Sequence, residues 1–185
     1  MRGGGDTVMS LAENLLCEEK RGETGLLLGG IFLDFDRTFA STKSGGSPFP
    51  KGVDAEAAPE TILESTDHTL DDNLLSLALT YPHLVRVVTR NSHVEHLQIF
   101  LAAHGISPAV TVRSVKLERT SKGKVMRQLL TGAHQNALAN GQSVKRVVGI
   151  FADDDLREHV HPHVEAIVKE PPAMYDLTRI MFVRG

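Results

Sequence analysis

The chain of 185 residues contains no tryptophan and a single cysteine, Cys17. One cysteine excludes an internal disulfide framework of the kind that stabilises small secreted domains. The fold must therefore depend on a hydrophobic core, and this length is sufficient for one domain with a core of useful size. These features predict a single domain in a reducing, intracellular compartment.

The sequence also lacks long apolar runs and a strong excess of charge. No stretch is long enough to span a bilayer, and the N-terminus shows neither the charged start nor the apolar segment of a signal peptide. A net charge of −3 provides no global positive charge to attract nucleic acid or an anionic membrane. We expect a soluble, cytoplasmic protein with no membrane partner, with the nucleus left open as a location.

Apolar strand-like runs alternate with helical patterns along the chain. Buried strands are expected at residues 26–33, 84–88, 110–115 and 146–151, an edge strand at 164–168 and a last strand at 178–183. Helices are expected near residues 7–20, 69–81, 93–105, 121–130 and 156–160. This order predicts an α/β, three-layer Rossmann-like fold with a mostly parallel central sheet.

The domain organisation follows from these elements. Residues 1–24 are expected to form an N-terminal tail and helix, and residues 25–185 a single α/β domain. Within that domain, residues 39–59 are rich in Ser, Gly, Pro and Lys and are too long for an ordinary connection. We expect residues 39–68 to form a small flap or loop insertion after the first core strand.

Two acidic side chains follow the first buried strand. Asp34 and Asp36 stand one residue apart in the stretch IFLDFDRT, and Thr38 comes next. Side chains at i and i+2 of an extended segment point the same way, so the two carboxylates would converge and repel unless a cation lies between them. The carboxyl ends of parallel strands are also where such folds bind ligands. The pattern indicates a metal site, or a nucleophile with an acid/base partner.

Three further stretches carry polar residues at the ends of predicted strands or the start of a helix. The strand at 146–151 is followed by Asp153, Asp154 and Asp155, and two carboxylate-rich strand ends are typical of a hard-cation site such as one for Mg²⁺. Thr89 ends the strand at 84–88 and supplies a hydroxyl. Lys122 and Lys124 open a helix, where lysine is unfavourable unless an anion approaches.

Taken in their order along the chain, these four stretches resemble the motifs of the haloacid dehalogenase superfamily of phosphohydrolases over about residues 28–160. The resemblance implies a capless member, whose open site often serves macromolecular substrates. Arg37 replaces a glycine often found after the second aspartate. The fourth stretch lacks an aspartate four residues after Asp153 or Asp154, and this leaves the additional metal acid open between Asp154, Asp155 and Glu158.

The resemblance also implies roles for individual residues. Asp34 would be the nucleophile, forming an aspartyl-phosphate, and Asp36 the general acid and base. Mg²⁺ would be held by Asp34, Asp153, Asp154 and the backbone carbonyl of Asp36. The phosphate-binding residues would be Thr89, Arg90 and Lys122, with Lys124 as the alternative lysine.

The predicted function is Mg²⁺-dependent hydrolysis of a phosphate monoester, with phosphotransfer as a variant. A non-catalytic module that binds phosphate or a partner is the first alternative, and retention of both Asp34 and Asp36 argues against it. A nucleic-acid end phosphatase is the second, although no aromatic platform for stacking bases is apparent. His159, His161 and His163 alternate in HVHPH, but Pro162 interrupts them, so we expect surface residues or residues that support a neighbouring site.

Overall fold

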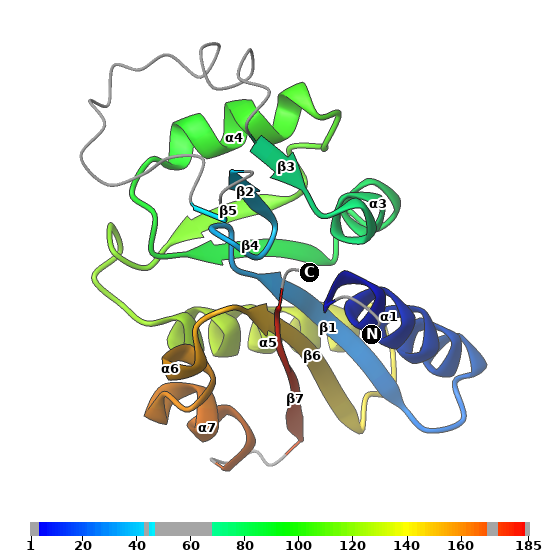
Figure 1. The fold of residues 1–185 in the computed structure, drawn as a ribbon. Coiled ribbons are helices and arrows are strands. Elements are labelled where there is room, and N and C mark those ends of the chain that lie inside the picture. Colours follow the sequence, from blue (N-terminus) through cyan, green and yellow to red (C-terminus); the bar gives the residue numbers. More distant parts are fainter. Residues whose placement is uncertain (1–3, 43–44, 47–67, 170–173, 184–185) are drawn as a thin grey trace.

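A five-stranded parallel sheet forms the centre of the protein in the computed structural model, which describes residues 4–42, 45–46, 68–169 and 174–183. The strand order is β5-β4-β1-β6-β7, and every adjacent pair is parallel. A separate two-stranded antiparallel sheet pairs β2 with β3. The α/β fold with a parallel central sheet is therefore confirmed, and it is compatible with a Rossmann-like arrangement (Figure 1).

The helices and strands follow the predicted alternation closely. In chain order they are α1 (Gly4–Arg21), β1 (Leu26–Leu33), β2 (Ala40–Thr42), β3 (His68–Leu70), α3 (Asp72–Thr80), β4 (Val85–Thr89), α4 (Val94–Ala103), β5 (Thr111–Ser114), α5 (Lys122–Ala139), β6 (Arg146–Asp153), α6 (Leu156–His159), α7 (Pro162–Lys169) and β7 (Tyr175–Met181).

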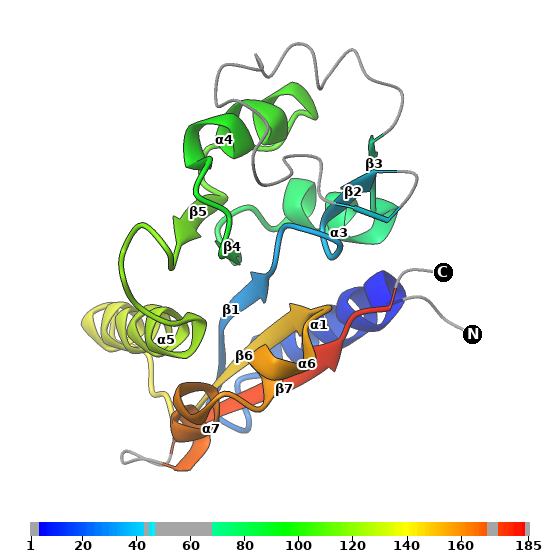
Figure 2. The same ribbon diagram turned by 60° about the vertical axis from the view of Figure 1, so that its left-hand side comes forward.

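Helices cover both faces of the sheet and enclose two hydrophobic cores. One core takes buried residues from α1, α3 and α4, such as Val8, Leu77 and Phe100. The other lies under α5 and α7, with Met126 and Ile167 among its members. Figure 2 shows α1 and α5 on opposite sides of the sheet. Because β1 and β6 are covered on both faces, their runs are continuously apolar rather than alternating.

The register of β1 and β6 positions the acidic residues. Leu33 pairs with Ala152, so Asp34, which directly follows β1, lies level with Asp153, the last residue of β6. The backbone N–H of Asp34 also donates to the carbonyl of Ala152 at 3.0 Å. Two neighbouring central strands therefore deliver carboxylates to one edge of the sheet, as parallel pairing requires.

The C-terminal part differs from the prediction in two elements. The edge strand predicted at 164–168 is wrong, because these residues belong to the helix α7. Pro162 occupies the first helical position, which suits proline, and Val164 and Ile167 are buried three residues apart on one helix face. The last strand runs over Tyr175–Met181, so it begins earlier than the predicted residue 178.

The start of the chain and the region after β3 also shift. The first helix begins at Gly4, so part of the predicted tail is helical. The helix predicted from Thr69 begins at Asp72 instead, because Thr69 lies in β3 and the Asp71 side chain caps α3 by accepting from the N–H groups of Asn73 and Leu74. The short pair of β2 and β3 flanks the predicted flap, most of which lies outside the described residues.

Within the part of the chain that the structure describes, no helix has both the length and the apolar character needed to cross a bilayer.

Candidate active site

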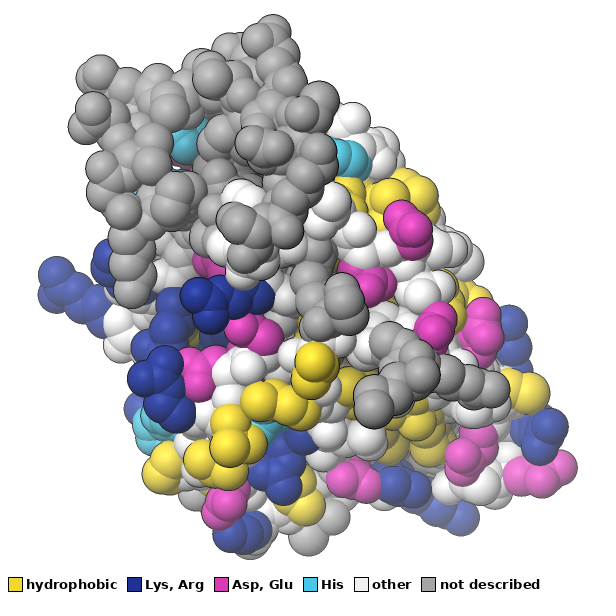
Figure 3. Space-filling model, in the orientation of Figure 1, with side chains coloured by type: hydrophobic (Ala, Val, Ile, Leu, Met, Phe, Trp, Pro, Cys, Tyr) yellow, Lys and Arg dark blue, Asp and Glu magenta, His cyan; other side chains and the backbone are white. Residues whose placement is uncertain are grey.

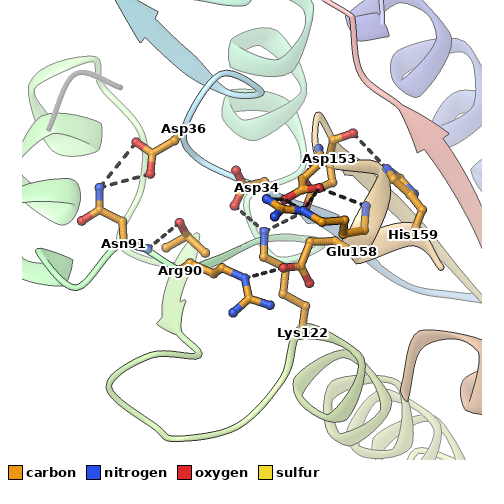
Figure 4. A network of polar contacts seen from close by, with 11 residues as sticks. Asp34, Asp36, Arg90, Asn91, Lys122, Asp153, Glu158 and His159 are labelled. Carbon is orange, nitrogen blue, oxygen red and sulfur yellow. Dashed lines mark hydrogen bonds and ion pairs between the residues drawn. The ribbon is translucent and has the colours of Figure 1, made fainter. Parts of the chain in front are cut away.

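A buried lysine joins the ends of β1 and β6. Lys122 Nζ donates to Asp34 Oδ1 at 2.5 Å and to Asp153 Oδ2 at 2.7 Å. The three residues expose only 6% (Asp34), 2% (Lys122) and 1% (Asp153) of their surface. Charged groups are rarely buried to this extent unless they are paired, and even a paired group loses its hydration. Helix or strand formation does not require this desolvation cost. Figure 4 shows the three side chains converging.

Two carboxylates share one ammonium in this cluster. Burial, together with the neighbouring Asp153, outweighs the attraction of Lys122 and raises the pKa of Asp34 from its ordinary value of 3.8 to about 7. Burial opposes the charge on Lys122, but the two carboxylates outweigh it and hold the pKa of the ammonium above its ordinary value. The cluster therefore has one negative charge in excess when both aspartates are ionised.

This arrangement predicts a pH-dependent stability of the metal-free protein. The folded state retains a proton on Asp34 up to a pKa of about 7, whereas the unfolded chain loses it near 3.8. Stability that this proton contributes is present below the lower value and is lost as the pH rises through the higher one. With EDTA present, the free energy of unfolding of the wild type should fall relative to that of Asp34→Asn between about pH 4 and about pH 7. Urea denaturation of both proteins measures the difference, and a constant difference would contradict the prediction.

A third acid lies beside the pair. Carboxylate oxygens of Asp34, Asp153 and Asp154 all lie within 4.8 Å of one another. Burial, followed by the charge of Asp153, raises the pKa of Asp154, and this outweighs the opposing effects of Arg37 at 3.9 Å, a backbone hydrogen bond and Lys122. Among the described residues, these three form the one set of three or more His, Cys, Asp or Glu side chains with a spacing suited to a metal ion.

The other two candidates for the additional acid have different partners. Asp155 caps α6 by accepting from the backbone N–H of Arg157, and the same carboxylate binds the Arg157 guanidinium at 2.7 Å. Glu158 is buried and accepts from Nε of Arg90. Of the three alternatives that the sequence left open, only Asp154 joins Asp34 and Asp153.

The Asp36 carboxylate points toward Asn91 and not toward Asp34 (Figure 4), although its charge contributes to the raised pKa of Asp34. The chain turns immediately after β1, so the i, i+2 rule for extended segments does not apply here, and the predicted convergence of Asp34 and Asp36 is not seen. The amide of Asn91 donates to both carboxylate oxygens of Asp36, at 3.4 and 3.2 Å. Asn91 thus positions Asp36, a role that sequence reasoning missed. The backbone carbonyl of Asp36 as a metal ligand stays a prediction.

The turn contains a residue in the left-handed region. Arg37 has a φ of 65°, and its N–H donates to the carbonyl of Ala40 at 2.8 Å. This conformation explains why a glycine suits the position. Thr38, which follows, is fully buried, and its hydroxyl has no hydrogen-bond partner among the described residues.

We expect Arg37→Gly to be more stable than Arg37→Ala. Both variants lose the same guanidinium, but only glycine adopts a positive φ without steric cost. For alanine, as for other L residues with a Cβ, this cost is about 1 kcal/mol. The midpoints of urea unfolding of the two variants provide the comparison. Equal stabilities would mean that the turn relaxes to a negative φ in the alanine variant.

The predicted phosphate-binding residues line one hollow of about 730 Å³, together with the acids. Thr89 is buried at the end of β4, where its hydroxyl accepts from the N–H of Asn91 at 3.1 Å. Arg90 follows it and is largely exposed. Lys124 lines a different hollow, of about 900 Å³, beside β1 and α5. Lys122 is therefore the lysine at the acidic cluster.

Ser121 and Gly123, on either side of Lys122, hold the start of α5 in place through contacts with His163. The Ser121 hydroxyl caps α5 by accepting from the N–H of Lys124 at 3.3 Å, and it also bonds Nδ1 of His163 at 2.8 Å. A Cβ added to Gly123 would lie 2.4 Å from the backbone of His163, so glycine lets α5 pack directly on α7. This close packing directs Lys122 toward the strand ends.

Two of the alternating histidines therefore have supporting positions. His159 is buried, and its Nε2 bonds the backbone carbonyl of Asp153 at 2.9 Å. His163 contacts the cap of α5 through Ser121. Ser121 and His163 are 42 residues apart, so no local pattern could have predicted their contact, whereas His159 reaches back only six residues to the end of β6.

The chain was compared with protein-family models, with curated proteins and with solved structures, and none of these comparisons finds a match. The functional assignment accordingly depends on the chemistry of the site itself.

Proposed function

We propose that the protein is a Mg²⁺-dependent phosphohydrolase that acts on a phosphate monoester, as a capless member of the haloacid dehalogenase superfamily. The observation that carries the proposal is the buried cluster of Asp34, Lys122 and Asp153 at adjacent strand ends. Phosphate esters react slowly, so catalysis needs positioning and neutralisation of charge at a fixed point. A buried carboxylate beside a buried ammonium supplies a nucleophile and a cation for the phosphoryl group.

The donor set fits Mg²⁺. Asp34, Asp153 and Asp154 offer three carboxylate oxygens within 4.8 Å, and oxygen is the ligand that this ion takes in proteins. Three acids around a single ammonium also leave excess negative charge for a dication to balance. These residues would hold the ion, which when bound would bring an anionic phosphate toward the anionic nucleophile.

The side chains divide the chemistry between them. Lys122 binds Oδ1 of Asp34, so Oδ2 is the oxygen available to attack phosphorus. As the new bond forms, the ester P–O bond breaks, and Asp36 gives a proton to the leaving alkoxide. Asp36 then accepts a proton from the water that hydrolyses the aspartyl-phosphate. Asn91 holds the Asp36 carboxylate in place for both transfers. Thr89 and Lys122 bind the oxygens of the phosphoryl group.

The proposal is tested with a panel of phosphorylated sugars, nucleotides, peptides and oligonucleotide ends, assayed with Mg²⁺ and with EDTA. Hydrolysis of at least one class that requires the metal supports the proposal. Binding of these esters with no turnover of any would favour the non-catalytic phosphate-binding module instead. Activity confined to oligonucleotide ends would favour the nucleic-acid end phosphatase.

Metal binding has a direct thermal signature. At about a hundredfold excess over Kd, Mg²⁺ should stabilise the fold by about 2.7 kcal/mol and raise Tm by about 5–10 °C. Asp153→Asn should lose most of this shift. Asp155→Asn is the matched control, because Asp155 caps α6 and asparagine caps helices about as well. Calorimetry with and without Mg²⁺ measures the shifts, and equal shifts in both variants would rule out Asp153 as a ligand.

A further inference from the structure

Arg90 combines an anchored guanidinium with an exposed position. Its Nε donates to Oε1 of Glu158, whose side chain is only 5% exposed, whereas the Arg90 side chain is 61% exposed. A buried carboxylate from α6 thus fixes the orientation of a cation that follows β4. Arginine side chains on a surface otherwise lose considerable rotamer freedom when they bind a ligand, and this anchor removes part of that loss.

The terminal nitrogens of Arg90 remain available. Among the residues that the structure describes, neither Nη1 nor Nη2 forms a hydrogen bond, and in Figure 4 the dashed line from Arg90 to Glu158 starts at Nε alone. Arg157 lines the same hollow but differs, because Asp155 accepts from both its Nε and its Nη2. Arg90 therefore presents a free fork, whereas the fork of Arg157 is occupied.

The basic side chains that line this hollow lie at two depths. Lys122 is 2% exposed and lies against Asp34, so it is the cation at the phosphoryl group. Arg90 is exposed at the mouth of the same hollow, where Lys116 is also exposed and forms no ion pair within the described part of the chain. Figure 3 shows basic side chains beside acidic ones on the side of the molecule where α6 lies.

From this arrangement we infer that the substrate carries a second anionic group, a carboxylate or a second phosphate, which Arg90 binds at the mouth of the site. Two parallel N–H groups of a guanidinium match the oxygen pairs of both anions. Lys116 adds the net positive charge that the Arg90–Glu158 pair lacks. This inference rests on the proposed function, because it assigns Asp34 and Lys122 to the phosphate that is hydrolysed.

Three probes of similar length test the inference. Propyl phosphate has no second charge, carboxyethyl phosphate replaces its terminal methyl with a carboxylate, and propanediol bisphosphate ends in a second phosphate. In the wild type, kcat/KM for the better charged probe should exceed that for propyl phosphate by about 10- to 100-fold, the range of a charge-assisted hydrogen bond. The preferred charged probe identifies the anion.

Variants locate the preference. Arg90→Gln should reduce the ratio of charged to uncharged kcat/KM to within about threefold of unity, a loss that matches one charge-assisted contact. Arg157→Gln, the matched control, should retain the ratio of the wild type. No preference in the wild type, or a preference that Arg90→Gln retains, overturns the inference.

Binding separates this inference from the proposed function. If the wild type hydrolyses none of the three probes, the phosphonates that correspond to them are compared by calorimetry. Tighter binding of a charged phosphonate that depends on Arg90 then supports the second anion site while the hydrolytic function fails. Equal binding of all three phosphonates overturns the second anion site as well.

Discussion

Substitution of Asp34 by asparagine is expected to lower the rate of phosphate ester hydrolysis by about 10³-fold or more. Asparagine keeps the size of the side chain but cannot form the covalent phosphoryl intermediate. The fold should survive, because Asp153 still pairs with Lys122 and the core under β1 is unchanged. Rates on p-nitrophenyl phosphate with saturating Mg²⁺, together with circular dichroism, measure both outcomes.

Asp155→Asn is the matched control for this experiment. Asp155 lines the same hollow, but its carboxylate caps α6 and binds Arg157. Its activity should stay within about threefold of wild type, a barrier change below about 1 kcal/mol. An Asp34→Asn protein that is folded and reaches the same rate would remove Asp34 from the chemistry.

Replacement of Lys122 by methionine is expected to destabilise the metal-free protein by about 3–5 kcal/mol at pH 8, because two buried carboxylates are left without their shared cation. The corresponding fall in Tm is about 6–20 °C for a domain of this size. Mg²⁺ should restore part of the loss, since a dication can take over the charge of the ammonium. Urea denaturation in EDTA and in Mg²⁺ gives the two free energies of unfolding.

Lys124→Met is the control for this variant. Lys124 is exposed two residues further along α5 and lines the other hollow, so its loss should change the free energy of unfolding by less than about 0.5 kcal/mol. A Lys122→Met protein as stable as Lys124→Met in EDTA would show that Asp34 and Asp153 do not depend on the ammonium.

The sequence by itself determined the α/β class and the strands that carry the acids. Apolar runs in β1 and β6 are bounded by turn residues and acids, and a strand buried on both faces leaves few other interpretations. It also predicted that the acids after these two strands would meet, because parallel strands end at a common edge. Their pairing in register, Leu33 with Ala152, is consistent with this.

Other features depended on the tertiary structure. Residues 164–168 contain β-branched side chains that suit a strand or a buried helix, and packing against α5 selects the helix. Asp36 was predicted to face Asp34, but the chain leaves the extended conformation in a turn that begins at Phe35, and Asn91 binds the Asp36 carboxylate. Local rules describe the extended chain, and they do not apply once the backbone turns.

The tertiary structure also decided which lysine lies in the site. Lys122 and Lys124 lie two positions apart on one helix, about 200° around its axis, so only one of them can face the strand ends. The choice depends on how α5 docks, which the contact of Gly123 with the backbone of His163 determines. The two residues in this contact, Gly123 and His163, are 40 positions apart in the chain. A sequence pattern cannot specify how two such distant segments pack.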